Sequence, residues 1–100
     1  MRTIVFTPDA HDDIDTAHHW YEQRRAGLGA TFESAIEAAL AQVQRAPERL
    51  PLTVEPFRRV AVRRFPHHIY YRFDAQRIVV LLVFRTAQDP AKALGRLSAH

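Results

Sequence analysis

The stretch IVVLLVFR at residues 78–85 is apolar at seven consecutive positions before its closing arginine. Successive residues of a β-strand point to opposite faces, so a strand with no polar set is buried on both faces. We therefore expect residues 78–85 to form a central strand of a sheet that is covered on both sides. A central strand needs neighbours, and the preceding sequence supplies them.

Two further strands are expected just before this one. Residues 67–73 (HHIYYRF) and 58–64 (RRVAVRR) both alternate in character, as half-buried strands do. The DAQR segment at residues 74–77 is short enough for a tight turn. The Phe65-Pro66 step separates the two strands, because proline donates no ladder hydrogen bond. The side chains expected to face the helices are Val60, Val62, Ile69, Tyr71 and Phe73.

Two helices are expected in the N-terminal half. Thr7-Pro8-Asp9 combines a capping residue, a proline suited to the first helical position and an acid that favours the positive helix end. Apolar residues then recur at steps of three or four until Gly27. A second amphipathic helix starts at residues 28–30 and ends before Pro47. The short loop between them predicts an antiparallel helical hairpin.

Two short elements complete the expected fold. Residues 3–6 (TIVF) read as a strand before the first helix, and Asp89-Pro90 opens a short last helix. The resulting order is β-α-α-β-β-β, a two-layer α+β fold. In it the helical hairpin packs on a mainly antiparallel four-stranded sheet of order 1-4-3-2, whose last strand runs antiparallel to the first. One hundred residues fit one domain, residues 1–100.

Composition narrows the classes of function. The chain has no cysteine, which excludes disulfides, thiolate metal ligands and cysteine nucleophiles. We see no signal peptide and no stretch of transmembrane length, so we expect a cytoplasmic protein that does not bind a membrane. Residues 1–50 hold five arginines and eight acidic residues, a balance of −3, whereas residues 51–100 hold nine basic and three acidic residues, a balance of +6. An arginine-rich half favours an anionic partner, either a nucleic acid or an acidic peptide.

An apolar floor ringed by arginines is expected on the sheet face away from the helices. The last strand would contribute aliphatic residues to this face, and the other two strands mostly basic ones. Such a surface is typical of a binding site and suits an acidic, partly apolar peptide. The alternative is that the C-terminal segment containing Leu94 and Leu97 covers the floor. The residues assigned to the outward face are Arg59, Arg63, His68, Tyr70, Arg72, Val79, Leu81, Val83 and Arg85.

Histidines and acids also follow one flank of the first expected helix, at positions His11, Asp15, His18 and Glu22. This spacing suits either a metal site or a stripe of ion pairs. One helix alone leaves a metal site incomplete, so we interpret the stripe as solvated ion pairs and expect neither a metal nor a cofactor.

Four short motifs occur in order along nearly the whole chain. They are VFTPDA at 5–10, followed by Asp13-Ile14 and Trp20-Tyr21; GLG at 27–29, followed by Phe32 and Pro47; RRFPHHIYY at 63–71; and VFRTAQDP at 83–90, followed by Arg96. In this order they resemble the RelE/ParE superfamily of toxins from type II toxin–antitoxin systems, the plasmid stabilisation type. The family fold is the same β-α-α-β-β-β arrangement.

The resemblance implies a growth-inhibiting toxin that a small cognate antitoxin neutralises. RelE-like members cleave mRNA on the ribosome, and ParE-like members inhibit DNA gyrase. Arg85 stands where the family often has histidine, and Gln88 where it often has arginine, both at the strand end where RelE-like members place catalytic groups. Together with Trp20-Tyr21 and Phe65-Pro66, these departures favour a ParE-like gyrase inhibitor, which would not be an enzyme.

Two alternatives remain open. The first is a ribosome-dependent mRNA endoribonuclease in which arginines hold the phosphate while a histidine or tyrosine transfers protons. Its candidate catalytic residues are Arg63, Arg72, Arg85, His68 and Tyr70. The second is a small basic binding module that has lost its toxin activity. The antitoxin-binding residues expected on the outward sheet face and the helical hairpin are Arg59, Arg63, Arg72, Val79, Leu81, Val83, Arg85 and Trp20.

Overall fold

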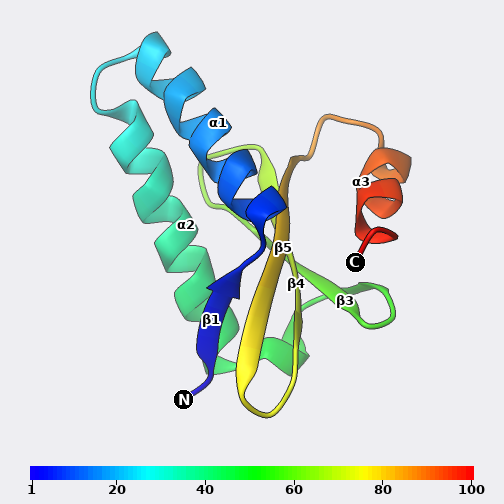
Figure 1. The fold of residues 1–100 in the computed structure, drawn as a ribbon. Coiled ribbons are helices and arrows are strands. Elements are labelled where there is room, and N and C mark those ends of the chain that lie inside the picture. The colour runs from blue at the N-terminus through cyan, green and yellow to red at the C-terminus, as the bar shows by residue number, and fades with distance from the viewer.

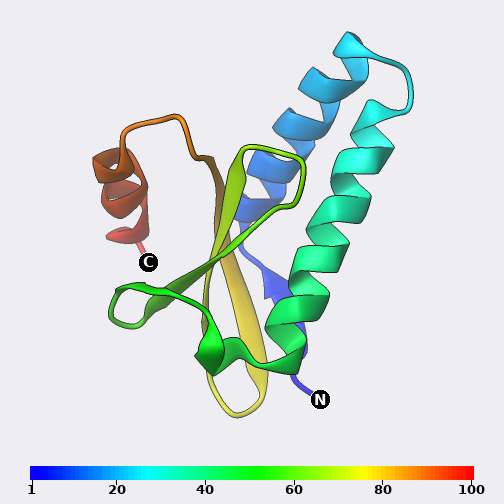
Figure 2. The ribbon, with the colours of Figure 1, turned by 180° about the vertical axis from the view of Figure 1, so that it is seen from behind.

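Two long helices lie side by side on one face of a five-stranded sheet in the computed structural model, which describes residues 1–100 (Figure 1). A third, short helix lies on the opposite face (Figure 2). The elements are β1 (Thr3–Phe6), α1 (Pro8–Arg24), α2 (Leu28–Arg45), the 3-10 helix η1 (Pro47–Arg49), β2 (Leu52–Val54), β3 (Phe57–Ala61), β4 (His67–Phe73), β5 (Arg77–Arg85) and α3 (Pro90–Leu97). The α+β fold predicted from the sequence is confirmed.

The helix boundaries follow the capping signals. The Thr7 hydroxyl accepts a hydrogen bond from the Ala10 N–H at 3.1 Å, and Pro8 is the first residue of α1. Gly27 joins the two helices with a φ of 88°, a left-handed conformation that glycine adopts at little cost. The Glu22 carboxylate accepts hydrogen bonds from the N–H groups of Gly27 and Gly29 and so fixes the loop between the helices. These two hydrogen bonds lower the Glu22 pKa below its usual value.

The strand order is β1-β5-β4-β3-β2. The order predicted for the four expected strands is therefore confirmed. β2 extends the sheet by one edge strand that the proline-rich segment at residues 46–56 concealed.

The predicted direction of the first strand was wrong, because β1 runs parallel to β5 and the sheet is mixed. α1 continues in the direction of β1 and α2 returns, so the chain reaches the end of the sheet where β1 began (Figure 1). The Gln44 side chain at the end of α2 accordingly donates to the Arg2 carbonyl at 2.7 Å. From there β3 runs in the same direction as β1, β4 runs opposite to it, and β5 is parallel to β1.

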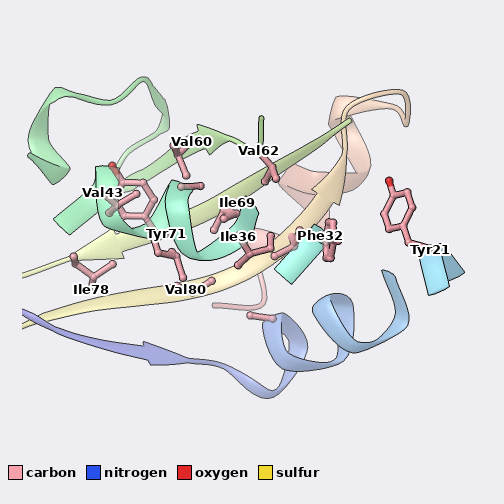
Figure 3. Close-up of a cluster of buried hydrophobic side chains, with 14 residues drawn as sticks. Tyr21, Phe32, Ile36, Val43, Val60, Val62, Ile69, Tyr71, Ile78 and Val80 are labelled. Carbon is pink, nitrogen blue, oxygen red and sulfur yellow. The ribbon is translucent and has the colours of Figure 1, made fainter. Parts of the chain in front are cut away.

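The main core lies between the helical hairpin and the sheet (Figure 3). Alternate residues of each strand meet the apolar stripes of α1 and α2, as the hydrophobic periodicity predicts. Tyr71 is fully buried here, and its hydroxyl donates to the Pro47 carbonyl at 2.7 Å, which joins β4 to the segment after α2. The buried members are Ala10, Tyr21, Phe32, Ile36, Ala39, Leu40, Val43, Val60, Val62, Ile69, Tyr71, Ile78, Val80 and Val83.

A β-bulge changes which residues of β5 face the helices. Tyr71 pairs with Val80 whereas Tyr70 pairs with Leu82, so one extra residue of β5 stands between them. Beyond the bulge, Val83 faces the helices, and Arg85 pairs with His67 on that same side. The prediction that Val83 and Arg85 share the outward face with Val79 and Leu81 was therefore wrong. Because all seven residues before Arg85 are apolar, the sequence contains no polar position that would reveal the shift.

The outward face carries a second core rather than an open floor. Val79 and Leu81 do lie on this face, but they are only 7% and 1% exposed because α3 covers them with Ala93 and Leu97. The alternative in which the C-terminal segment covers the floor is thus the one the structure contains. Asp89 caps α3 by accepting the Ala91 N–H at 3.0 Å, in agreement with the predicted helix start.

Candidate functional site

A pocket of about 330 Å³ opens between α1 and the C-terminal end of β5. One wall is a face of α1 on which residues recur at helical spacing, and the other wall is β5 with the segment that follows it. The volume is at the lower end of the range for ligand sites, about 300–1,000 Å³. The lining residues are Asp12, Asp13, Thr16, Ala17, Trp20, Tyr21, His67, Val83, Phe84, Arg85, Gln88 and Arg96.

The short length of β1 creates one end of this pocket. β1 stops opposite Val80, so the outer edge of β5 beyond that residue has no strand partner. Side chains from the start of α1 take its place: the Thr7 hydroxyl donates to the Leu81 carbonyl at 2.7 Å, and Asp13 accepts the Val83 N–H at 2.9 Å. Buried backbone groups need such partners, which explains why α1 lies close against this part of the sheet.

Asp13 connects three elements. Besides the Val83 N–H of β5, its carboxylate accepts hydrogen bonds from the Arg96 guanidinium of α3 at 3.0 Å. Burial raises the Asp13 pKa above its usual value, although the hydrogen bonds from Val83 and Arg96 act in the opposite direction. The ion pair with Arg96 balances the charge at this end of the pocket.

The base of the pocket holds a buried tyrosine–histidine pair. The Tyr21 hydroxyl and His67 Nε2 lie 3.1 Å apart and share a hydrogen bond. Burial, with the nearby positive charge of Arg85 as a smaller cause, lowers the His67 pKa to about 4, so the imidazole is neutral at pH 7. Burial also raises the Tyr21 pKa. Both groups are thus neutral and far from the pKa near 7 that suits a general acid or base.

An exposed aromatic ring and a free cation form the opposite end of the pocket. Trp20 is 41% exposed, and the Arg24 guanidinium lies over its ring at 4.0 Å from the centroid. The Arg85 guanidinium lies 5.7 Å from the same centroid and forms no salt bridge. Cations near the face of a tryptophan ring are held by its quadrupole, and an unpaired guanidinium remains available for a carboxylate or phosphate.

The structure divides the predicted site residues into four groups. Trp20, Val83 and Arg85 meet in the pocket, although we expected the last two on the opposite face. The strand pairing puts Arg59, His68, Tyr70 and Arg72 on the outward face, where Tyr70 is buried beside α3. Arg63 lies in the exposed turn between β3 and β4 rather than within a strand. Val79 and Leu81 are covered by α3, as described above.

The five candidate catalytic residues do not converge on one point. His68, Tyr70 and Arg72 share the outward face, Arg63 lies in a turn, and Arg85 is on the helix side. Burial lowers the His68 pKa, with the charge of Arg59 as a second cause. A 2′-hydroxyl cleavage site needs its acid, base and cations around a single phosphate, and this arrangement does not provide that.

Several pocket residues could not be identified from sequence spacing. Asp13 and Arg96 are 83 positions apart and Tyr21 and His67 are 46 apart, so only the folded chain joins each pair. One pattern in the sequence does point to the pocket wall on α1. Asp12, Thr16 and Trp20 follow at steps of four, and residues at such steps share a helix face.

The histidine and acid stripe of α1 has two roles in the structure. His18 contacts Glu33 of α2 at 2.5 Å and His19 contacts Asp15 at 3.6 Å, while Glu22 closes the helix connection. No group of three or more histidine, cysteine, aspartate or glutamate side chains is arranged to hold a metal ion. Nor does the structure contain a helix with the length and apolar character needed to cross a membrane.

Comparisons with known proteins agree with the fold. A family model described as the ParE toxin of the parDE type II toxin–antitoxin system matches residues 4–90. The structure is similar to a chain of the chromosomal ParDE toxin–antitoxin system of P. aeruginosa, with 20% identity and a TM-score of 0.62 over 85% of this chain and 96% of that one. A search of curated protein sequences gives no match.

Two further solved structures are similar. A YoeB/ParE toxin from Agrobacterium tumefaciens shares 21% identity, with a TM-score of 0.58 over 83% of this chain and 96% of that one. A chain of the RelBE2 toxin–antitoxin complex of Mycobacterium tuberculosis shares 25% identity, with a TM-score of 0.53 over 84% and 96%. At these identities the likenesses concern the fold.

Proposed function

The chain belongs to the ParE toxin family of type II toxin–antitoxin systems, and from that membership we propose that it inhibits growth until a cognate antitoxin neutralises it. The solved neighbours include chains of ParDE and RelBE2 toxin–antitoxin systems. A protein partner is also supported by the pocket, which combines apolar walls with an unpaired guanidinium.

The antitoxin site is centred on Trp20, Val83 and Arg85. These three residues come from separate parts of the sequence and line one pocket. The half-exposed indole offers apolar contact area, and the Arg85 guanidinium is free to donate hydrogen bonds to a carboxylate. The complementary segment is therefore an apolar side chain next to an acidic one. The outward arginines Arg59 and Arg72 and the turn residue Arg63 add positive charge that attracts an acidic peptide from a distance.

DNA gyrase is the target we favour over mRNA. The observation that carries this choice is the separation of Arg63, Arg72 and Arg85 from one another, since a nuclease needs its cations around one phosphate. Inhibition of gyrase by binding requires no acid–base pair. The neutral, buried Tyr21–His67 pair is consistent with a binding role for the pocket.

Induced expression tests the toxin activity and its target together. We expect growth arrest, loss of gyrase supercoiling activity in a purified assay, and mRNA that stays intact in a ribosome-dependent cleavage assay. Cuts at codon positions in mRNA with normal supercoiling would favour the RelE-like nuclease instead. Unimpaired growth, with neither gyrase nor mRNA affected, would identify a binding module that has lost its toxin activity.

Two matched arginine variants test the antitoxin site. Arg85→Gln removes the free guanidinium in the pocket, and Arg77→Gln removes an exposed arginine at the other end of the same strand. We expect Arg85→Gln and Trp20→Ala to weaken antitoxin binding at least tenfold, with Arg77→Gln close to wild type, in a calorimetric titration with the antitoxin. Equal effects of the two arginine variants would move the site away from this pocket.

A further inference from the structure

A second hollow, of about 350 Å³, lies on the helical hairpin and has no part in the proposed antitoxin site. It opens between α1 and α2 beside the end of β1; in Figure 1 the two helices run side by side and β1 leads into the start of α1. Four apolar side chains line it, and one of them, Phe6, is 45% exposed. The lining residues are Phe6, His11, Ile14, Asp15, His18, His19, Glu33, Ile36, Glu37 and Leu40. We refer to it as the hairpin groove.

The lining of the hairpin groove is acidic, whereas the chain as a whole has a formal net charge of +3. Asp15, Glu33 and Glu37 line it together with three histidines, and none of the fourteen lysine and arginine residues of the chain does. The two helices together carry seven acidic residues and only two arginines. Glu33 and Asp15 contact histidines, which leaves the Glu37 carboxylate without a salt-bridge partner. The groove therefore repels an acidic peptide and attracts a basic one.

The apolar side chains of the hairpin groove determine what else the partner must supply. Phe6 sits at the last residue of β1 and is exposed although it is large and aromatic, and Ile14 beside it is only partly buried. A polar ligand would leave this apolar surface in water, whereas an apolar side chain would cover it and gain free energy from the buried area. The small volume accommodates a few side chains rather than a folded domain.

We propose that the hairpin groove, with Phe6, Ile14, Glu33 and Glu37 at its centre, binds a basic protein segment that inserts one or two apolar side chains between lysine or arginine residues. Charge complementarity selects this occupant, and the exposed phenylalanine provides the apolar anchor point. The small domain then has two docking sites of opposite charge, so an acidic partner at the Trp20–Arg85 pocket and a basic partner at the hairpin groove do not compete.

The test uses the whole chain and a labelled synthetic peptide in which two leucines one helical turn apart are flanked by lysines. An acidic twin carries glutamate at every lysine position. We expect fluorescence anisotropy to show saturable binding of the basic peptide only, and amide chemical-shift changes in the protein to centre on the hairpin groove. Absence of saturable binding, or shifts centred elsewhere, would overturn the proposal.

Charge variants distinguish specific binding in the hairpin groove from non-specific attraction of the peptide to acidic side chains elsewhere on the surface. Glu33→Gln/Glu37→Gln removes two carboxylates of the groove, and Glu48→Gln/Glu55→Gln removes two exposed carboxylates elsewhere. We expect at least tenfold weaker binding for the first pair and less than a twofold change for the second. Equal losses would overturn the proposal, because non-specific attraction would then explain the binding.

Two more variants test the charge and the apolar part of the groove separately, and the first also shows that a loss of binding does not come from unfolding. Glu33→Lys/Glu37→Lys reverses the charge and should bind the acidic twin in place of the basic peptide, which a merely unfolded variant would not do. Phe6→Ala should weaken binding of the basic peptide about tenfold. If sedimentation shows that the chain itself dimerises and that Phe6→Ala abolishes the dimer, a second copy occupies the groove and the proposal fails.

Discussion

Replacement of Asp13 tests how the free edge of β5 is stabilised. In Asp13→Ala the Val83 N–H loses its acceptor and Arg96 loses its ion-pair partner. A partly buried N–H left without a partner costs about 1–3 kcal/mol, and an ion pair with a third of the arginine exposed adds at most about 1 kcal/mol. We expect a loss of about 2–3 kcal/mol, equivalent to a melting temperature roughly 10–20 °C lower for a domain of this size.

Asp13→Asn separates the hydrogen bond from the charge. The amide oxygen still accepts the Val83 N–H, so we expect a loss of about 1 kcal/mol or less. The raised pKa of Asp13 leads to the same expectation, because burial already disfavours the ionised carboxylate. Urea unfolding at pH 7, followed through the fluorescence of the single tryptophan, Trp20, measures both variants. Equal losses for the two variants would refute the reasoning, since the charge rather than the Val83 hydrogen bond would then be what stabilises this edge.

The pH dependence of the Asp13 contribution has a definite sign. A carboxyl whose pKa is raised in the folded state binds its proton more tightly there than in the unfolded chain. Its contribution to the free energy of unfolding is thus full below the ordinary value of 3.8 and falls as the pH rises through the raised pKa. The difference in stability between wild type and Asp13→Asn should shift in that direction over the same pH range.

Four further substitutions test the packing and the buried histidine. Gly29→Ala should lower stability by about 1–3 kcal/mol, because a Cβ at this position would lie 2.8 Å from the His18 ring and 2.9 Å from the His18 carbonyl oxygen. Gly95→Ala should instead raise stability by about 0.5–1 kcal/mol, because a Cβ there would lie in open space within α3. Thermal unfolding checks both variants. Because the pKa of His67 is lowered, the unfolded chain takes up a proton below pH 6.5 and the folded chain only near pH 4. Stability should therefore fall by at most about 3 kcal/mol as the pH drops through that window. His67→Phe should remove this pH dependence in urea titrations. Leu97→Ala should cost about 2–4 kcal/mol by the same method, because this residue of α3 is 1% exposed and packs on the outward sheet face. A change near zero would mean that α3 does not close the second core.

The sequence predicted the parts of the fold that depend on local chemistry. The Thr7-Pro8 cap and the Pro47 stop locate α1 and α2 to within a few residues, because capping groups and proline act on the backbone beside them. The strand order followed from the fully apolar segment that became β5. The antiparallel pairing of β3, β4 and β5 also followed, but the direction of β1 did not, since it depends on which way α1 leaves the end of β1.

The predicted site was only partly recovered, for a physical reason that lies in β5. Alternation identifies a strand's two faces only where polar and apolar residues alternate, and residues 78–84 offer no polar position. The shift of Val83 and Arg85 to the helix side could therefore not be seen. Trp20 was predicted to bind the antitoxin because it lies at the edge of the first helix. It is close to Arg85 only because the bulge turns Arg85 to the helix side.

The β-bulge between Val80 and Leu82 decides which face of β5 carries Arg85, because it shifts the alternation of the strand by one residue. Exchanging one aliphatic residue for another here leaves both layers apolar. Straightening the strand with every residue kept would instead turn every later side chain of β5 over and carry Phe84 under α1 and Arg85 toward α3. Deleting Leu81 would remove the bulge and leave Val83 and Arg85 on the helix side. A straightened strand of the same length would take the cation out of the pocket between α1 and β5. In relatives of this chain, a one-residue gap opposite the Tyr70–Tyr71 step would therefore mark a regular strand that keeps its arginine in the pocket without a bulge.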